Sequence, residues 1–391
     1  MKIIYLVHAR IPTEKAHGVQ IMKMCEALAD QIKIKKNGFT PDSKVELVVA
    51  NRYNPDFKGI DSFDFYSIKE NFTIRRLLVI NFLCYRIPFA FIFELVLFSL
   101  IAFFYLLFQN GRIVVYTRGE TLPFLKFLPK RFSIFWETHI MPKNFNRYRK
   151  ILLKTKGAVV VTKHYYEELI KNNVFLPDKV LLAPDAVNME QFSIKDSKTD
   201  IRKRFGLDND KKIVLYTGKL SEWKGVYVLL KASKYLPSNI VVIFIGGMEE
   251  SIRDFRATSN KLNTKNALIL GYKPPKEIPY WLKAADILVL PNSGKGRISN
   301  FYTSPLKLFE YMASKRPIIA SDLPCLRDIL NKNNAVLVEP DNPKALAKSI
   351  EITLKKPDFC AKISGRAFKD VKKYSWQNRA GEVIRFIKRN L

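Results

Sequence analysis

The sequence predicts an α/β protein of two domains, each a doubly wound parallel sheet with helices on both faces. The chain has 391 residues, and this length favours two domains of ordinary size over one hydrophobic core. Its strand-like segments are continuous runs of Val, Ile and Leu, which are typical of parallel strands buried on both faces. The runs alternate with helical patterns in two series, and a polar stretch at 193–211 separates them.

The first series predicts a domain over residues 1–192, with strands at 3–7, 45–50, 113–116, 132–136, 157–162 and 179–183. A helix is predicted between the first two strands, because apolar residues recur there with a period of 3.6. These residues are Ile21, Met24, Cys25, Leu28, Ala29 and Ile32. Strand, helix and strand in this order form one βαβ unit of a parallel sheet.

The second series predicts a domain over residues 193–374, with strands at 213–218, 240–245, 267–270, 286–290, 317–320 and 335–338. The polar stretch 193–211 is the expected linker. Residues 375–391 are expected to form a C-terminal helix that packs back on the first domain.

The net charge of +30 is the outlying feature of the composition, because hydrophobic residues (48%) and charged residues (26%) are otherwise those of a packed protein. Such a surface attracts nucleic acid, anionic lipid headgroups or phosphorylated sugars. No nucleic-acid-binding signature accompanies the charge, so nucleic acid is not expected as a partner. The N-terminus carries no secretion signal, and a cytoplasmic location is expected.

The cysteines are widely scattered, without a CxxC pair or a nearby histidine. They are Cys25, Cys84, Cys325 and Cys360. This spacing predicts reduced thiols and no metal site.

Four segments of the second half carry the most specific motifs. They are Tyr216–Val226, Ala285–Pro291, Ser304–Ala313 and Ala320–Pro324. Each follows or ends a predicted strand, where open α/β sheets bind ligands. In this order they resemble glycosyltransferase family 4, and the resemblance extends over nearly the whole chain. It implies the GT-B fold, two Rossmann-like domains facing a central cleft, and retaining sugar transfer from a nucleotide diphosphate sugar without a metal or cofactor.

The loop after the strand at 213 is the first part of the predicted donor site. Gly218 lets the backbone come close to an anion, and Lys219 and Lys224 supply two positive charges. This pattern fits a diphosphate, and the alternative is a plain turn with two solvated lysines. The resemblance implies that both lysines bind the donor and stabilise the leaving diphosphate in catalysis.

The second part of the predicted donor site is a helix start. Ser304 and the backbone N–H groups of Leu306 and Lys307 stand where the helix dipole favours phosphate. Glu310 resembles the ribose-binding glutamate of the family, although without the motif it would read as a surface glutamate. Tyr272 follows the third strand of this domain, at the usual place of the nucleobase in the family.

One position departs from the family pattern. Tyr302 stands where the family has a first glutamate, eight residues before the second, that contacts the donor sugar. The donor sugar therefore cannot be inferred from this loop, and an inactive GT-B partner subunit is an alternative. We still place Tyr302 in the donor site by its position.

In the first domain, the loop at 8–20 resembles the glycine-containing loop of the family. Gly18 is expected near the donor phosphates, and His17 near the acceptor. Arg118 follows the strand at 113–116 and could face the acceptor or form a surface salt bridge. His139 matches the family position that points at the reacting sugar, and we infer a catalytic role for it, although a lone histidine at a strand end is often structural.

Residues 87–108 form an apolar run with a single charge, long enough to span a bilayer as a helix. Its flanking strands are expected in one sheet, which argues against crossing and for a helix lying in the lipid interface. The stretch 126–156 adds nine Lys or Arg and only one acid, which predicts contact with anionic lipid or, alternatively, a solvated basic face.

These patterns lead to one interpretation. The chain is expected to be a peripheral glycosyltransferase on the inner face of the cell membrane. It would move a sugar from a nucleotide diphosphate sugar to a hydroxyl of a lipid-linked or polysaccharide-precursor acceptor. A soluble family member acting on a small acceptor is the alternative.

Overall fold

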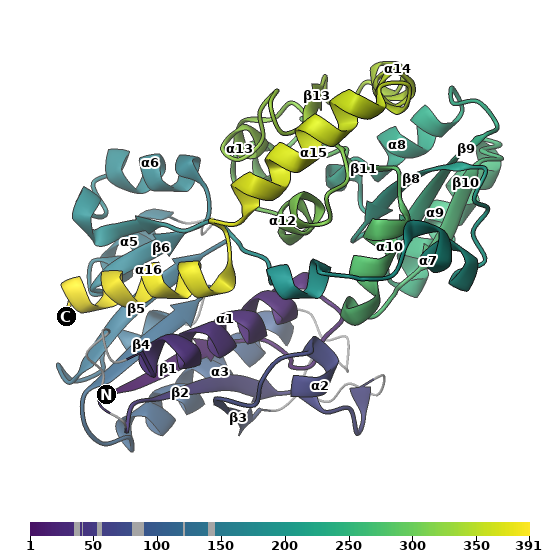
Figure 1. The fold of residues 1–391 in the computed structure, drawn as a ribbon. Coiled ribbons are helices and arrows are strands. Elements are labelled where there is room, and N and C mark those ends of the chain that lie inside the picture. The colour runs from purple at the N-terminus through teal and green to yellow at the C-terminus, as the bar shows by residue number, and fades with distance from the viewer. Residues whose placement is uncertain (35–39, 41, 53–56, 80–89, 120–121, 140–144) are drawn as a thin grey trace. The chain divides into compact units, whose positions relative to one another are not determined.

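The computed structural model describes residues 1–34, 40, 42–52, 57–79, 90–119, 122–139 and 145–391. The chain forms two compact units (Figure 1). The first comprises Met1–Pro184 and Trp376–Leu391, and the second comprises Asp185–Ser375. Outside the described residues lie Cys84, Lys143 and positions 87–89 of the apolar run, and the side chains of Phe145 and Arg147 are not described either.

The first unit contains a sheet of seven parallel strands in the order β3-β2-β1-β4-β5-β6-β7. The strands are β1 (Lys2–Val7), β2 (Lys44–Asn51), β3 (Thr73–Leu78), β4 (Ile113–Arg118), β5 (Phe132–Thr138), β6 (Gly157–Val160) and β7 (Val180–Leu182). Most of the strand residues of β1, β2, β4, β5 and β6 are buried, as continuous apolar runs predict.

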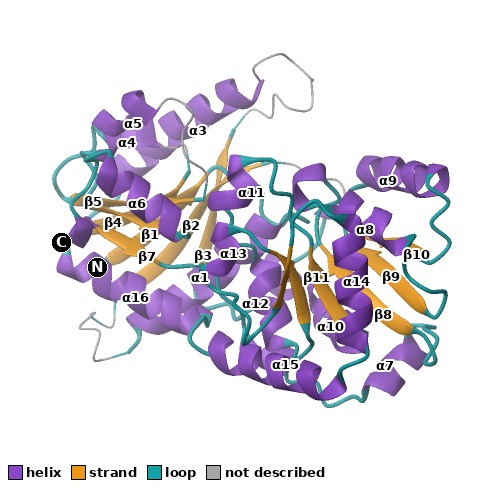
Figure 2. Cartoon of the chain, turned by 90° about the horizontal axis from the view of Figure 1, so that it is seen from above, coloured by secondary structure: helices purple, strands orange, loops and turns teal. Residues whose placement is uncertain are grey.

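Helices cover both faces of this sheet (Figure 2). They are α1 (Ala16–Ile32), α2 (Ser62–Tyr66), α3 (Ala90–Leu107), α4 (Leu122–Leu125), α5 (Phe145–Leu152), α6 (Lys163–Lys171) and α16 (Trp376–Arg389), with the short 3-10 helix η4 (Pro177–Lys179). The C-terminal helix α16 packs beside α1 (Figure 1). The last helix of the chain is therefore part of the first unit.

The second unit contains a sheet of six parallel strands in the order β10-β9-β8-β11-β12-β13. They are β8 (Lys212–Thr217), β9 (Ile240–Ile245), β10 (Ala267–Gly271), β11 (Ile287–Leu290), β12 (Ile318–Ser321) and β13 (Val336–Val338). The strand order reverses between β8 and β11, and open sheets of this kind bind ligands beside that reversal.

Two hydrophobic clusters cover the two faces of this second sheet, with Leu215 in one and Val214 in the other. The helices are α7 (Lys198–Arg204), α8 (Val226–Ser233), α9 (Glu249–Lys261), α10 (Ile278–Ala284), α11 (Arg297–Phe301), α12 (Leu306–Ala313), α13 (Pro324–Arg327), α14 (Pro343–Leu354) and α15 (Pro357–Val371). The 3-10 helices are η5 (Met189–Phe192), η6 (Glu222–Lys224) and η7 (Pro275–Glu277).

Strand β3 was not expected from the sequence. It is the edge strand of the first sheet, and Thr73, Arg75 and Arg76 are exposed along it. An edge strand needs less apolar surface than a central one, so the search for continuous apolar runs passes over it.

The segment 193–211 is not a free linker, and the units divide at 184/185 rather than at 192/193. The segment contains α7, whose Arg202 is buried. Its guanidinium donates to the Asp286 carboxylate at 2.6 Å and to the Ala284 carbonyl at 2.9 Å. A polar sequence here therefore reflects a helix held to the second unit by a buried ion pair.

Candidate functional site

The predicted donor residues of the second unit gather at the carboxyl end of its sheet, beginning with the loop after β8. Gly218 has φ +124° and would be strained with a side chain. A Cβ at the neighbouring Gly246, which follows β9, would lie 2.4 Å from the Gly218 carbonyl oxygen. The two loops therefore meet backbone to backbone at this edge of the sheet.

Lys307 places its side chain beneath this loop. The side chain is buried, and its Nζ donates to the Thr217 carbonyl at 2.7 Å and lies 3.6 Å from the centre of the Tyr216 ring. A Cβ on Gly218 would come within 3.0 Å of the same Nζ. Burial, and then the charge of Lys224, lower the pKa of Lys307 well below its ordinary value. The sequence predicted only the backbone N–H of Lys307, and the structure adds a buried ammonium.

Lys224 stands at the end of η6, on a loop that is fixed against the segment after β11. Gly225 follows it with φ +68°, and a Cβ there would lie 1.6 Å from the Pro291 carbonyl oxygen. The Lys224 Nζ lies 3.8 Å from the centre of the Trp223 ring. Burial lowers the pKa of Lys224 to about 8, and the charge of Lys219 acts in the same direction. Lys219 itself is exposed.

Helix α12 begins at Leu306 without a side-chain cap, so its first N–H groups are not satisfied in that way. Ser304 does not cap it, because its hydroxyl accepts a hydrogen bond from the backbone N–H of Asp185 at 3.1 Å. The Tyr311 hydroxyl accepts from the Thr217 N–H at 2.8 Å and ties the helix to β8. Burial raises the pKa of Glu310 to about 7, although the nearby Lys307 opposes the shift.

Tyr302 and Tyr272 differ in their surroundings. Tyr302 is buried, and its hydroxyl accepts a hydrogen bond from the Arg297 guanidinium at 2.9 Å. The position that carries a carboxylate in the family is therefore filled by a phenol held by a cation. Tyr272 follows β10 and is 40% exposed.

Sequence reasoning missed Asn292, which follows β11 next to Pro291. It is fully buried, and neither polar atom of its side chain has a hydrogen-bond partner among the described residues. The segment is fixed by a hydrogen bond from the Ser293 N–H to the Trp223 carbonyl at 3.1 Å. An asparagine after an apolar strand gave no signal to separate it from an ordinary loop residue.

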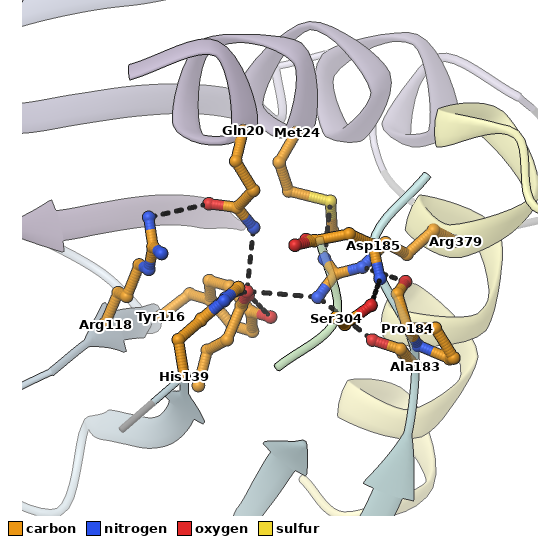
Figure 3. Close-up of polar contacts among 11 residues, drawn as sticks. Gln20, Met24, Tyr116, Arg118, His139, Ala183, Pro184, Asp185, Ser304 and Arg379 are labelled. Atoms are coloured by element: carbon orange, nitrogen blue, oxygen red, sulfur yellow. Dashed lines mark hydrogen bonds and ion pairs between the residues drawn. The ribbon is translucent and has the colours of Figure 1, made fainter. Parts of the chain in front are cut away.

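In the first unit, His139 lies with Gln20, Tyr116 and Arg379 (Figure 3) around the buried carboxylate of Glu137. The Glu137 Oε1 atom accepts from the His139 Nε2 at 2.6 Å, from the Gln20 amide at 2.8 Å and from the Arg379 guanidinium at 3.0 Å. Its Oε2 atom accepts from the Tyr116 hydroxyl. Glu137 is completely buried, and sequence reasoning gave it no role.

Arg118, His17 and Gly18 lie in the same unit. Arg118 donates to the side-chain Oε1 atom of Gln20 at 3.0 Å and so joins the Glu137 network, and among the described residues it forms no salt bridge. Burial lowers the pKa of His17 to about 4, and the charge of Arg118 adds to the effect. A Cβ on Gly18 would meet the Tyr66 hydroxyl at 2.2 Å. The need for glycine at this position is therefore explained by packing.

This arrangement of two doubly wound parallel units, with lysines and a carboxylate at the carboxyl edge of the second sheet, defines the class of GT-B glycosyltransferases. Residues 197–370 match the family described as Glycosyl transferases group 1. The match covers most of the second unit, and it identifies that unit as similar to glycosyltransferase family 4. The resemblance stated from the sequence is confirmed, and so is the predicted fold.

Comparisons with individual proteins agree with this assignment. The chain is 27% identical over 213 residues to a Bacillus subtilis protein named as the teichuronic acid biosynthesis glycosyltransferase TuaC, a match that covers 54% of this chain and 50% of that protein. This chain therefore spans half the length of that relative.

Two solved structures share the fold over the whole chain. Sucrose-phosphate synthase from Thermosynechococcus elongatus has a TM-score of 0.78 at 18% identity, with 100% of this chain and 99% of that chain covered. Anabaena Alr3699/HepE, solved in complex with UDP and glucose, has a TM-score of 0.74 at 12% identity with both chains fully covered.

Proposed function

We propose that this protein transfers a sugar from a nucleotide diphosphate sugar to a hydroxyl group of an acceptor, with retention of configuration and without a metal ion. The second unit would bind the donor. The first unit would bind the acceptor and provide His139 at the reacting sugar, with Arg118 and His17 on the acceptor side. Lys219 and Lys224 would stabilise the charge that grows on the leaving diphosphate.

The observation that carries this proposal is an excess of basic groups at the carboxyl end of the second sheet, where Lys224 and Lys307 lie near a single carboxylate, Glu310. Buried arginines elsewhere pair with carboxylates, as Arg202 does with Asp286 and Arg379 with Glu137. Lys224 and Lys307, by contrast, form no ion pair with a carboxylate among the described residues. A desolvated ammonium group is costly unless an anion joins it, and burial lowers the pKa of both lysines for this reason. A diphosphate supplies that anion.

The donor to test first is a uridine nucleotide, because HepE is the structural neighbour solved with UDP-glucose. Thermal unfolding of the protein with UDP, GDP or ADP measures binding, since a ligand stabilises the state that it binds. We expect one of the three to raise Tm, and Lys224→Met to weaken that rise. Lys234→Met, an exposed lysine of the same unit, is the matched control. Absence of a Tm rise with every nucleotide, and of transfer from every sugar donor offered, contradicts the proposal.

The acceptor is proposed to be a lipid-linked or polysaccharide precursor reached at the membrane surface. The TuaC relative, named for teichuronic acid biosynthesis, supports a saccharide precursor. Among the described residues, α3 is the one helix long and apolar enough to cross a membrane by length and composition. Such a helix can also belong to a soluble core, so its two faces decide the question.

The faces of α3 differ sharply. Glu94, Phe98, Ala102 and Leu106 recur every four residues on its buried face, and the Glu94 carboxylate pairs with Arg52 there. The opposite side exposes a set of large apolar side chains: Ile92, Phe93, Val96, Leu100 and Phe104. The strands before and after α3, β3 and β4, belong to one sheet. These facts support a helix held on the protein with one face available to lipid.

Basic residues lie on or beside the helices that neighbour α3. Helix α3 packs on α4, and α4 packs on α5, while Arg131 donates to the Leu107 carbonyl at the end of α3 at 2.7 Å. Lys126, Lys130 and Lys150 are exposed on or beside these elements. An apolar face beside exposed cations fits an anionic lipid surface, to which each cation contributes about 1 kcal/mol.

Flotation with vesicles tests this part of the proposal. We expect binding to vesicles rich in phosphatidylglycerol, weaker binding as salt rises, and poor binding to phosphatidylcholine. Joint replacement Lys126→Glu and Lys150→Glu, or the single change Phe93→Ser, should lower binding. Lys234→Glu with Lys261→Glu makes the same charge change on the second unit and should have less effect. Attachment that ignores salt, lipid charge and all these changes contradicts a peripheral anionic-lipid surface.

A further inference from the structure

Glu137 is a fully buried carboxylate that receives four hydrogen bonds from four different elements. Its donors come from α1 (Gln20), β4 (Tyr116), the end of β5 (His139) and α16 (Arg379). A carboxylate alone in such a place would take up a proton, because burial disfavours charge. The pKa of Glu137 is nevertheless held well below its ordinary value, with Arg379 as the largest opposing influence on the burial effect and His139 as the next. Glu137 is therefore ionised.

Arg379 is fixed independently of Glu137. Its guanidinium donates to the Pro184 carbonyl at 3.0 Å, to the Ala183 carbonyl at 3.3 Å and to the Met24 sulfur at 3.1 Å, and the side chain is buried (Figure 3). The C-terminal helix thus brings a permanently charged group to a defined place beside the Glu137 carboxylate. Its position does not depend on the state of the histidine.

An ionised carboxylate accepts hydrogen bonds and donates none, and this decides where two protons lie. The Nε2 atom of His139, 2.6 Å from Glu137, must carry a hydrogen. The neutral ring is then the Nε2–H tautomer, with the lone pair on Nδ1. Gln20 donates its amide to Glu137 at 2.8 Å, so its carbonyl is turned toward Arg118.

We propose that Glu137 is a positioning residue for both His139 and Arg118, and that Arg379 of the C-terminal helix keeps it ionised. His139 is held directly, and Arg118 is held through Gln20. Neither Glu137 nor Arg379 touches a reacting atom. The inference rests on the proposed function only for its kinetic consequence, because the tautomer and charge of His139 can be measured without any substrate.

Nitrogen-15 NMR of ring-labelled histidine in the full chain tests the structural part. The protein has only four histidines, so single substitutions assign the signals. We expect neutral His139 to show the Nε2–H tautomer. In Glu137→Gln the neighbouring negative charge is gone, and the His139 ring should lose its proton at a lower pH than in the parent protein. The matched control is Glu168→Gln, which removes the acidic neighbour of His164 on the surface and should leave the His139 signals unchanged.

Glu137→Gln leaves Arg379 buried without its partner, and such a variant can fail to fold. The double variant Glu137→Gln with Arg379→Gln removes both charges and keeps the shapes. It should also lower the pH at which the His139 ring loses its proton, but by less than the single variant does, because the positive charge of Arg379 is removed as well. Arg379→Gln alone should raise the pKa of Glu137, because the largest influence that opposes burial is gone. Where Glu137 is then protonated, the His139 signals should shift in the same direction as in Glu137→Gln.

The kinetic arm separates positioning from mere stability. Loss of alignment of His139 is expected to lower kcat by about 10- to 100-fold in the folded variants, with the donor KM little changed. If the His139 signals do not respond to Glu137→Gln or the double variant, the inference is wrong even though sugar transfer stands. If they respond but kcat of correctly folded protein stays at the parent value, Glu137 is structural and the inference is again wrong. If the parent transfers no sugar while the signals respond as expected, the proposed function fails and the positioning of His139 is still supported.

Discussion

Replacement of Glu310 by Gln should stabilise the free protein and weaken nucleotide binding at the same time. Glu310 sits at the carboxyl end of the second sheet, and its pKa is raised from an ordinary 4.5 to about 7 because it is buried. Within the described part of the chain, no group donates a hydrogen bond to its carboxylate. The carboxylate is therefore free to accept a hydrogen bond from a donor such as a ribose hydroxyl.

The size of the effect follows from the pKa. A rise from 4.5 to about 7 corresponds to about 3 kcal/mol of destabilisation of the ionised form, at about 1.4 kcal/mol for each pKa unit. A folded pKa above the unfolded one means that stability from this group is present below pH 4.5 and is lost as pH rises through about 7. Gln does not ionise, so its advantage should be small near pH 5 and complete by about pH 8. For a unit of this size, 1 kcal/mol is about 2–4 °C in Tm.

Scanning calorimetry at several pH values measures this advantage, and titration calorimetry with the nucleotide that binds measures the second effect. Loss of a charged acceptor for a ribose hydroxyl should cost about 1.5–3 kcal/mol of binding free energy. Glu250→Gln, an exposed glutamate of the same unit, is the control for both. A Glu310→Gln protein that binds nucleotide as the parent does, or whose Tm advantage does not grow with pH, refutes the reasoning.

Three further outcomes are expected. Alanine at Lys219 or Lys224 should lower kcat more than it raises the donor KM, because charge grows on the diphosphate in the transition state; a pure KM effect at both would mean that they only hold the donor. Burial lowers the pKa of Lys224 to about 8. Donor affinity measured by calorimetry should therefore fall by about tenfold from pH 7 to pH 9, because this lysine loses its charge over that range. An affinity that does not change with pH would contradict binding of the diphosphate by charged Lys224. Gly225→Ala should lower Tm strongly, because the new Cβ meets the Pro291 carbonyl oxygen. The control Gly365→Ala places a Cβ in open space in α15 and should leave Tm unchanged or raise it. Equal Tm values for the two variants would show that the contact with Pro291 is easily relieved.

Most of the fold could be predicted because parallel strands reveal themselves as local apolar runs. Thirteen strands lie in the two sheets of the described residues, and the one that was missed, β3, is an exposed edge. The polar segment around α7 misled the search for a linker, because the buried partner of Arg202, Asp286, lies 84 positions away. A pattern of apolar residues indicates that one helix or strand is buried. It does not indicate that two charged residues far apart in the sequence, such as Arg202 and Asp286, form an ion pair.

The same distinction separates the parts of the site. Gly218, Lys224 and Glu310 belong to short motifs, and the structure brings these motifs to one edge of one sheet. Glu137 gave no signal, because its partners Gln20 and Arg379 stand 117 and 242 positions away. Lys307 was predicted for its backbone N–H, and no pattern indicated that its ammonium would be buried below Gly218.

Tyr302 bears on whether the protein is an active transferase or an inactive partner subunit. The sequence places a tyrosine where the family has a glutamate, and the structure adds that Arg297 donates to its hydroxyl. The position is therefore occupied by a tyrosine whose hydroxyl is hydrogen-bonded to Arg297. The donor-sugar contacts that the family assigns to the glutamate must come from other groups or be absent. A transferase can lose those contacts and keep Lys224, Lys307 and Glu310 for the nucleotide. An inactive partner subunit would also bind nucleotide, so binding alone does not separate the two. Turnover of nucleotide sugars by the purified parent protein does, because transfer or hydrolysis of any of them excludes the inactive alternative, and binding without turnover of the whole panel supports it.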